Sequence, residues 1–206
     1  TLFDHADAAE VRVPSSCARD GSCHECIVEV IEGGDLLSER TEAERFLSGG
    51  YRLACQATVQ QDGDLKVITL KRRPKILTDA WQLEVPLEPL TRRVGDRVYR
   101  GDEDIDEYRG EILGLAIDVG TTTVALHLVD LETGTVNATA AFENPQMFAG
   151  SNVLHRIEYD NNDSEGEQKR VLMGHLNDEI RRMTKRRKIY EIVVSGNPTM
   201  RDLFFG

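Results

Sequence analysis

Apolar and polar residues follow a regular pattern mainly in the second half of the chain. From Glu111 the stretch ILGLAIDVGTTTVALHLVDLETGTVNATAAFENP contains apolar runs separated by two turn segments, a Gly-Thr turn and an ETG turn. Short apolar runs with turns of this kind between them are typical of β-strands joined as hairpins. The pattern therefore predicts three consecutive strands that form a meander.

A helical pattern follows the polar loop NNDSEGEQ. The basic run from Arg181 to Lys188 falls at the predicted C-terminal end of the helix, where cations complement the helix dipole, and this explains it better than a nucleic-acid surface does. The next segment, YEIVV, predicts a strand that ends at Ser195, Gly196 and Asn197, which suits either a ligand site or a plain tight turn. The helix is predicted from one apolar stripe, formed by Val171, Leu172, Leu176, Ile180 and Met183.

The stretch between Lys71 and Glu111 has many charges, several prolines and no sustained period of 2 or 3.6. Such a composition predicts a linker, which we place at residues 73–111. Trp81 and Leu83 are expected to pack on a neighbouring domain, so that the tether is partly ordered. A small extra subdomain with a strand at Val94–Tyr99 is the alternative.

The chain has 206 residues, enough for two small domains, and a net charge of -11 with a pI near 5.0. This acidity argues against binding to nucleic acids or anionic membranes, and it suits an electron carrier that docks on basic partners. The absence of a long apolar run and of a signal-like N-terminus predicts a cytoplasmic protein. Because the sequence starts at Thr1 and ends on an apolar segment, we expect it to be a fragment.

Four cysteines lie in the first 55 residues, in CARDGSCHEC and LACQAT. Three closely spaced cysteines with a distant fourth are typical of plant-type 2Fe-2S clusters, in which each iron takes two thiolates. Gly21 and Ser22 would let the loop wrap around such a cluster. Structural zinc fits less well because only one C-x2-C knuckle is present, and disulfides would require an oxidising compartment. His24 is interpreted as a solvent-facing neighbour, and the predicted ligands are Cys17, Cys23, Cys26 and Cys55.

The segments VPSSCARDGSCHECIVEVIEGG and YRLACQATV resemble the cluster loop and the fourth-ligand strand of 2Fe-2S ferredoxins. The wider first cysteine gap is similar to that of the adrenodoxin-like branch. This resemblance implies a β-grasp domain at residues 1–72 that lacks the family's first hairpin. It also implies a helix at Leu2–Ala9 and strands at Cys26–Ile31 and Leu65–Leu70.

Asp118 ends the first strand of the predicted meander, and Gly120 with three threonines, Thr121, Thr122 and Thr123, forms the following turn. Glycine allows close approach of the backbone, N–H and hydroxyl groups can donate to phosphate, and the carboxylate suits Mg²⁺ or an attacking water. An ordinary glycine hairpin next to an aspartate is the alternative. The pattern is not a Walker A loop, since the lysine is missing.

This turn resembles the first phosphate motif of the acetate and sugar kinase, heat-shock chaperone and actin superfamily. The resemblance implies an α+β chain in which residues 112–206 are the first part of a ribonuclease-H-like ATPase lobe. Asp118 would then be the catalytic residue, and Gly120, Thr121, Thr122 and Thr123 would bind ATP with Mg²⁺.

The combined order of segments, with AIDVGTTT, NPQMFAGSNVLHRI and VVSGNPTM, resembles the reductive activators of corrinoid-dependent enzymes. That family implies a 2Fe-2S protein that takes electrons from an upstream donor and reduces an inactive Co(II) corrinoid protein, or a corrinoid-dependent methyltransferase, at the expense of ATP. The alternatives are a simple electron-transfer protein with a non-catalytic second lobe and a small-molecule kinase regulated by its cluster.

Overall fold

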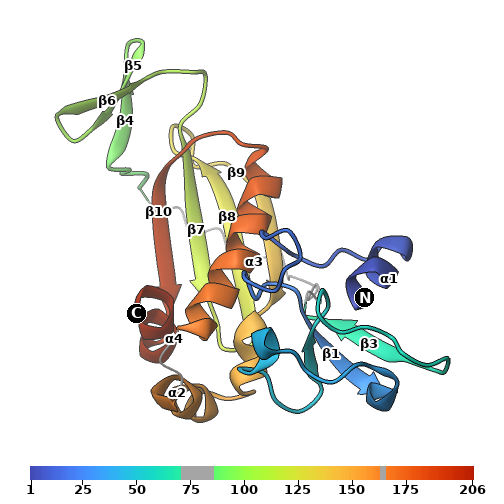
Figure 1. Ribbon diagram of the computed structural model, residues 1–206. Coiled ribbons are helices and arrows are strands. Elements are labelled where there is room, and N and C mark those ends of the chain that lie inside the picture. The colour runs from blue at the N-terminus through green and yellow to red at the C-terminus, as the bar shows by residue number, and fades with distance from the viewer. Residues whose placement is uncertain (71–85, 163–165) are drawn as a thin grey trace.

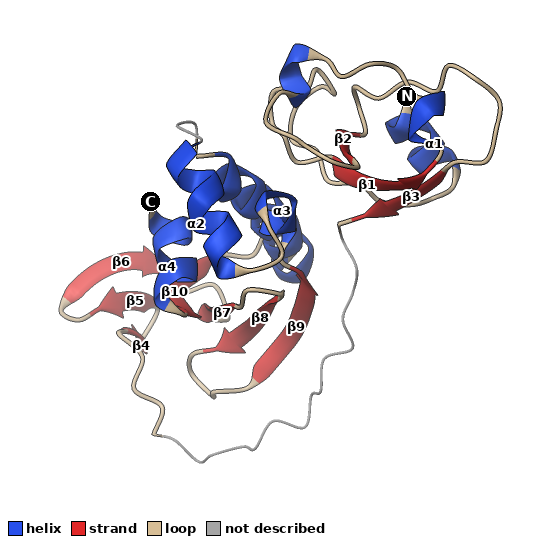
Figure 2. Cartoon of the chain, turned by 90° about the horizontal axis from the view of Figure 1, so that it is seen from below, coloured by secondary structure: helices blue, strands red, loops and turns tan. Residues whose placement is uncertain are grey.

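The computed structural model describes residues 1–70, 86–162 and 166–206. Within these residues the strands form three sheets, which lie one after another along the chain (Figure 1). Helices cover one side of the central sheet, as the view from below shows (Figure 2). None of the helices in these residues is long and apolar enough to cross a membrane.

The N-terminal sheet has the order β2-β1-β3, and β1 pairs antiparallel with both neighbours. Helix α1 is fixed to the segment that follows β2, because the backbone N–H of Phe3 donates to the carbonyl of Ala54 over 2.9 Å. The helix and the two strands expected from the ferredoxin resemblance are confirmed in position. The elements of this part are α1 (Leu2–Ala8), β1 (Ile27–Glu32), η1 (Gly34–Leu36), η2 (Glu42–Glu44), β2 (Tyr51–Leu53) and β3 (Lys66–Thr69).

A second antiparallel sheet lies inside the range that the sequence predicted to be a linker. Its strands are β4 (Thr91–Val94), β5 (Arg97–Arg100) and β6 (Glu103–Glu107). The linker prediction is therefore corrected for these residues, and the alternative, a small subdomain, is closer. The single strand suggested at Val94–Tyr99 is wrong, because this range contains the hairpin turn between β4 and β5. Charged cross-strand pairs stabilise the sheet, such as the ion pair between Arg97 and Asp104 over 2.8 Å. Strands with charged residues on their faces lack the alternation of apolar and polar positions by which a strand is predicted from sequence. Trp81 and Leu83 lie outside the described residues.

The central sheet contains the predicted meander, which is confirmed: β7, β8 and β9 pair antiparallel in sequence order. Strand β10, which includes the predicted YEIVV strand, adds to the free edge of β7 in parallel, so the order is β10-β7-β8-β9. A parallel pair needs a crossover, and α3 provides it. The strands are β7 (Leu113–Val119), β8 (Thr123–Asp130), β9 (Val136–Glu143) and β10 (Ile189–Gly196).

Helix α3 packs with two different faces, and it stands between the central sheet and the N-terminal part (Figure 1). Leu172 and Leu176 join the core of the central sheet, whereas the neighbouring Val171 packs into the core of the N-terminal part. The predicted helix is confirmed, and Arg181 and Arg182 lie in its last turn. The remaining elements of this part are η3 (Pro145–Ala149), α2 (Val153–Asn162), α3 (Glu167–Thr184) and α4 (Pro198–Phe205).

We expect Leu172→Ala to lower the free energy of unfolding by roughly 2–5 kcal/mol, because it leaves a cavity under α3. Leu172 is fully buried, whereas Leu154 on α2 is 75% exposed. The control Leu154→Ala should therefore change stability by less than about 0.5 kcal/mol. Urea unfolding followed by far-UV circular dichroism measures both variants, and equal losses of stability would contradict the burial of Leu172 in the core of the central sheet.

Candidate metal centre and phosphate-binding turn

The four cysteines form two pairs. The Sγ atoms of Cys26, just before β1, and Cys55, just after β2, are 3.4 Å apart. Ser15 bridges the other pair, since its Oγ lies 3.8 Å from Sγ of Cys17 and 3.9 Å from Sγ of Cys23. All four are free thiols. Two pairs of thiols match the donor set of a 2Fe-2S cluster, in which each iron takes two thiolates.

In each pair, one thiol has a lowered pKa and so ionises more readily than a free cysteine. Burial opposes ionisation of Cys17, but hydrogen bonds from Cys23 and Ser15 prevail and lower its pKa to about 7. The hydrogen bond from Cys26 lowers the pKa of Cys55 to about 6, although burial opposes this shift. That same hydrogen bond, together with burial, raises the pKa of Cys26. The thiolate is the form that binds metals such as iron. Each pair therefore contains one cysteine whose lowered pKa favours the metal-binding form.

His24, between Cys23 and Cys26, does not face solvent as expected. Its side chain is only 12% exposed, and its Nδ1 lies 2.6 Å from Oε2 of Glu167 at the start of α3. The ring also stacks on Phe46 with 4.3 Å between centroids. The prediction of a solvent-facing histidine is wrong because its partner is 143 residues away in sequence.

The predicted phosphate-binding turn connects β7 to β8 and is held by its own backbone. The N–H of Gly120 donates to the carbonyl of Thr123 over 3.0 Å, and a Cβ on Gly120 would lie 2.6 Å from that oxygen. Only glycine fits there without a shift. Asn144, just after β9, fixes the turn, because its Nδ2 donates to the carbonyl of Gly120 over 2.9 Å and its backbone N–H donates to the carbonyl of Thr122 over 2.7 Å.

The end of β10 meets this turn at the same edge of the sheet. Ser195 lies opposite Asp118 in the parallel register, and Nδ2 of Asn197 donates to Oγ1 of Thr121 over 3.3 Å. Asn197 also caps α4, because its Oδ1 accepts from the N–H of Met200. Asn197 thus forms a one-residue connection between β10 and α4, next to the predicted phosphate-binding turn. A ligand site at this segment stays a prediction.

A buried arginine lies beneath the turn, and no periodicity in the sequence singles it out. Arg156 on α2 is 1% exposed. Its guanidinium donates to the carbonyls of Thr121 over 2.7 Å and Gly150 over 2.9 Å. Burial lowers its pKa to about 10. The only signal in the sequence was its place in NPQMFAGSNVLHRI, the segment that resembled a family motif.

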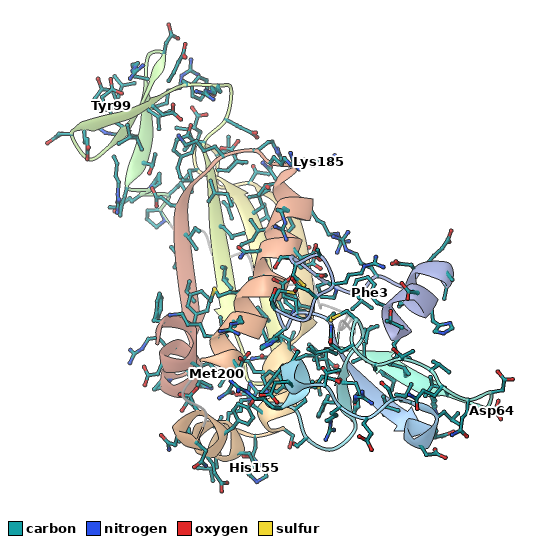
Figure 3. All side chains as sticks on the ribbon, in the orientation of Figure 1. Phe3, Asp64, Tyr99, His155, Lys185 and Met200 are labelled. Atoms are coloured by element: carbon teal, nitrogen blue, oxygen red, sulfur yellow. The ribbon has the colours of Figure 1, made fainter. Side chains whose placement is uncertain are left out.

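An open groove of about 1250 Å³ lies between the N-terminal part and the helices next to the turn. His24, Phe46 and Tyr51 line it from the N-terminal side, and Gly150, His155 and Tyr159 line it from the other. His155 lies on α2 at the outer edge of the molecule (Figure 3). The groove therefore runs from the cysteine loop to the end of η3.

Two segments of the chain match known families. Residues 1–60 match the 2Fe-2S iron-sulfur cluster binding domain, and residues 113–206 match the RACo middle region. The first match contains all four cysteines, and the second contains the turn after β7 and helix α3. The chain therefore joins a segment that matches the 2Fe-2S cluster binding domain to a segment that matches the RACo middle region.

Curated relatives are similar to parts of this chain. The corrinoid activation enzyme RamQ of Eubacterium limosum is 32% identical over 106 residues, which are 48% of this chain and 18% of RamQ. Chlorosome protein J of Chlorobaculum tepidum is 35% identical over 75 residues, 33% of each chain. One component of the Na⁺-translocating NADH-quinone reductase of Chlamydia felis is 37% identical over 60 residues, 28% of this chain and 14% of that component.

A solved structure resembles almost the whole chain. It is a reductive activator for corrinoid, iron-sulfur protein, with a TM-score of 0.53 and 23% identity over 98% of this chain and 45% of that one. At this identity the likeness concerns the fold. The chain spans less than half of the length of each of these relatives.

Proposed function

We propose that this chain is a section of a reductive activator, in which a 2Fe-2S domain reduces an inactive Co(II) corrinoid protein in an ATP-dependent reaction. The observation that carries the proposal is the pairing, in one chain, of two cysteine pairs with a Gly-Thr turn on an adjoining lobe. The similarity to RamQ and to the corrinoid activator fold supports it. The corrinoid protein or its methyltransferase would be the partner, with an upstream electron donor and a cytoplasmic location.

The proposal assigns electron transfer to the cysteine site and nucleotide binding to the turn after β7. A bound 2Fe-2S cluster of the plant type would supply single electrons at a reduction potential of about -400 mV. Cys17 and Cys23 would hold one iron, and Cys26 and Cys55 the other, since these are the pairs of neighbouring thiols. Ser15, between Cys17 and Cys23, would donate a hydrogen bond to one of their sulfur atoms.

In the second lobe, we assign phosphate binding to Gly120 and Thr121–123, and Mg²⁺ or water orientation to Asp118. Reducing Co(II) corrinoid is harder than reducing the cluster, so the electron transfer is uphill. ATP can assist only by favouring a conformation of the complex in which cobalt is easier to reduce. In this proposal residues 1–72 are a β-grasp ferredoxin domain and residues 112–206 the first part of a ribonuclease-H-like ATPase lobe.

The second candidate is a plain electron carrier with a structural second lobe. The observation that favours it is the similarity to chlorosome protein J and to the quinone reductase component. Both have a higher percentage identity to this chain than RamQ has, though over shorter stretches. Purified protein with an intact cluster and no ATPase activity, with or without a corrinoid partner, would support this candidate.

Protein expressed and purified without oxygen should contain about two iron and two sulfide per chain and show the visible spectrum of a 2Fe-2S cluster. The physical reason is that four thiolates in two pairs satisfy two irons. Metal and sulfide analysis measures the content. One zinc per chain without sulfide would contradict the assignment of the cysteines.

A further inference from the structure

The loop that carries the cysteines packs against α3 through contacts on one face of the helix. His24 contacts Glu167, Glu25 lies against Gly174, and Arg12 forms an ion pair with Asp178. These helix positions are seven and four residues apart and therefore share a face. Both residues between Cys23 and Cys26 thus contact the same helix of the second lobe.

The contact at Gly174 is close enough to require glycine. A Cβ at this position would lie 2.3 Å from Cγ of Glu25, whose side chain is buried. At the start of the helix, Glu167 is 1% exposed and accepts from both His24 and Arg170, the latter over 3.1 Å. A buried carboxylate with two partners is costly to separate from them, so this contact fixes the loop to α3.

From Glu167 the path continues to the phosphate-binding turn through the adjacent residue of the helix and two hydrogen bonds. The next residue, Gln168, is fully buried, and its Nε2 donates to the backbone carbonyl of Arg156 over 2.8 Å. Arg156 in turn donates to the carbonyl of Thr121 over 2.7 Å. The path therefore runs from Thr121 through Arg156, Gln168 and Glu167 to His24.

Arg156 is the step of this path that can respond to a ligand. Within residues 1–70, 86–162 and 166–206 its guanidinium forms no ion pair, and its partners are backbone carbonyls and Sδ of Met200. A buried cation without a counter-charge is unfavourable, so a phosphate at the turn would attract it. Movement of Arg156 would shift its own carbonyl, which Gln168 holds.

We propose that this path, from Thr121 through Arg156 and the start of α3 to His24, couples the phosphate-binding turn to the cysteine loop. It rests on the proposed function in that the ligand at the turn is a nucleotide phosphate. Binding there changes the contact of α3 with the residues between Cys23 and Cys26, and so the surroundings of the cluster. The coupling is reciprocal, as linkage requires.

The coupling can be tested without nucleotide, by amide hydrogen exchange on the cluster-loaded protein. Glu167→Ala should speed exchange in peptides that cover residues 119–124 by about threefold or more, because the start of α3 loses its anchor. The matched control is Glu158→Ala, an exposed glutamate on α2 that lines the same groove but is not on the path. Unchanged exchange at residues 119–124 in a folded Glu167→Ala protein would overturn the proposal.

A second variant tests the path in the opposite direction if Glu167→Ala does not fold. Arg156→Lys keeps the charge but loses the forked pair of hydrogen bonds, and it should speed exchange at residues 17–26 by about threefold or more. No change there would overturn the proposal.

In the wild type, ATP should change the visible circular dichroism of the cluster, and Glu167→Ala should lose that response. If the wild type does not bind ATP but the exchange effects appear, the proposed function fails and the coupling stands. If ATP binds and the exchange effects are absent, the coupling fails alone.

Discussion

Cys55→Ala should abolish assembly of the 2Fe-2S cluster, reducing bound iron and sulfide from about two each per chain to near zero. Cys55 is buried after β2, and its sulfur lies 3.4 Å from that of Cys26. Without it one iron keeps a single thiolate, and no other cysteine is present to replace it. Visible absorbance and iron and sulfide analysis of the anaerobically purified protein measure the effect.

Thr58→Ala is the matched control for this variant, since Thr58 lies three residues further on and its side chain is exposed. It should retain the full cluster content. Far-UV circular dichroism distinguishes loss of the ligand from loss of the fold. A stoichiometric cluster in Cys55→Ala would remove Cys55 from the set of ligands.

Asp118→Asn should reduce ATP-dependent reduction of the corrinoid partner by about 100-fold or more while the cluster spectrum stays unchanged. This substitution keeps the shape of the side chain and removes the negative charge that would hold Mg²⁺ or orient water. Asp118 pairs with Ser195 across β7 and β10, at the edge where Thr121 contacts Asn197. Reduction of the corrinoid is followed by its visible spectrum, with and without ATP.

Asp102→Asn makes the same chemical change on a fully exposed carboxylate in the turn between β5 and β6. This control should leave ATP-dependent reduction unchanged. If Asp118→Asn also lost the cluster, Asp118 would be a folding residue rather than a catalytic one. If it retained full activity, the assignment of the turn to ATP would be wrong.

Local features of the sequence were sufficient for much of the fold. The meander of β7 to β9 was predictable because alternating apolar runs and glycine turns involve near neighbours. The same holds for α3, whose stripe repeats every three or four residues. The sheet of β4 to β6 was not predictable from the sequence, because its cross-strand contacts join charged residues such as Arg97 and Asp104. Charged residues are also common in linkers.

The candidate sites divide in the same way. The cysteine spacing and the Asp118 to Thr123 turn are short, contiguous patterns, so their residues could be named from the sequence. Arg156 could not be assigned a role, since its partners, Thr121 and Gly150, come from other elements. Burial of an arginine leaves no signature in a one-dimensional pattern, because the residue type itself predicts exposure.

The sequence by itself determined the four cysteines in their spacing, the glycine-threonine turn at the end of β7, and the apolar stripe of α3. Only the tertiary structure decided what that helix packs against: Leu172 joins the central sheet, while Val171 joins the N-terminal core. It also decided that His24 contacts Glu167, 143 residues away. The physical reason is that an apolar stripe specifies burial but not the partner, which depends on long-range packing of both parts of the chain.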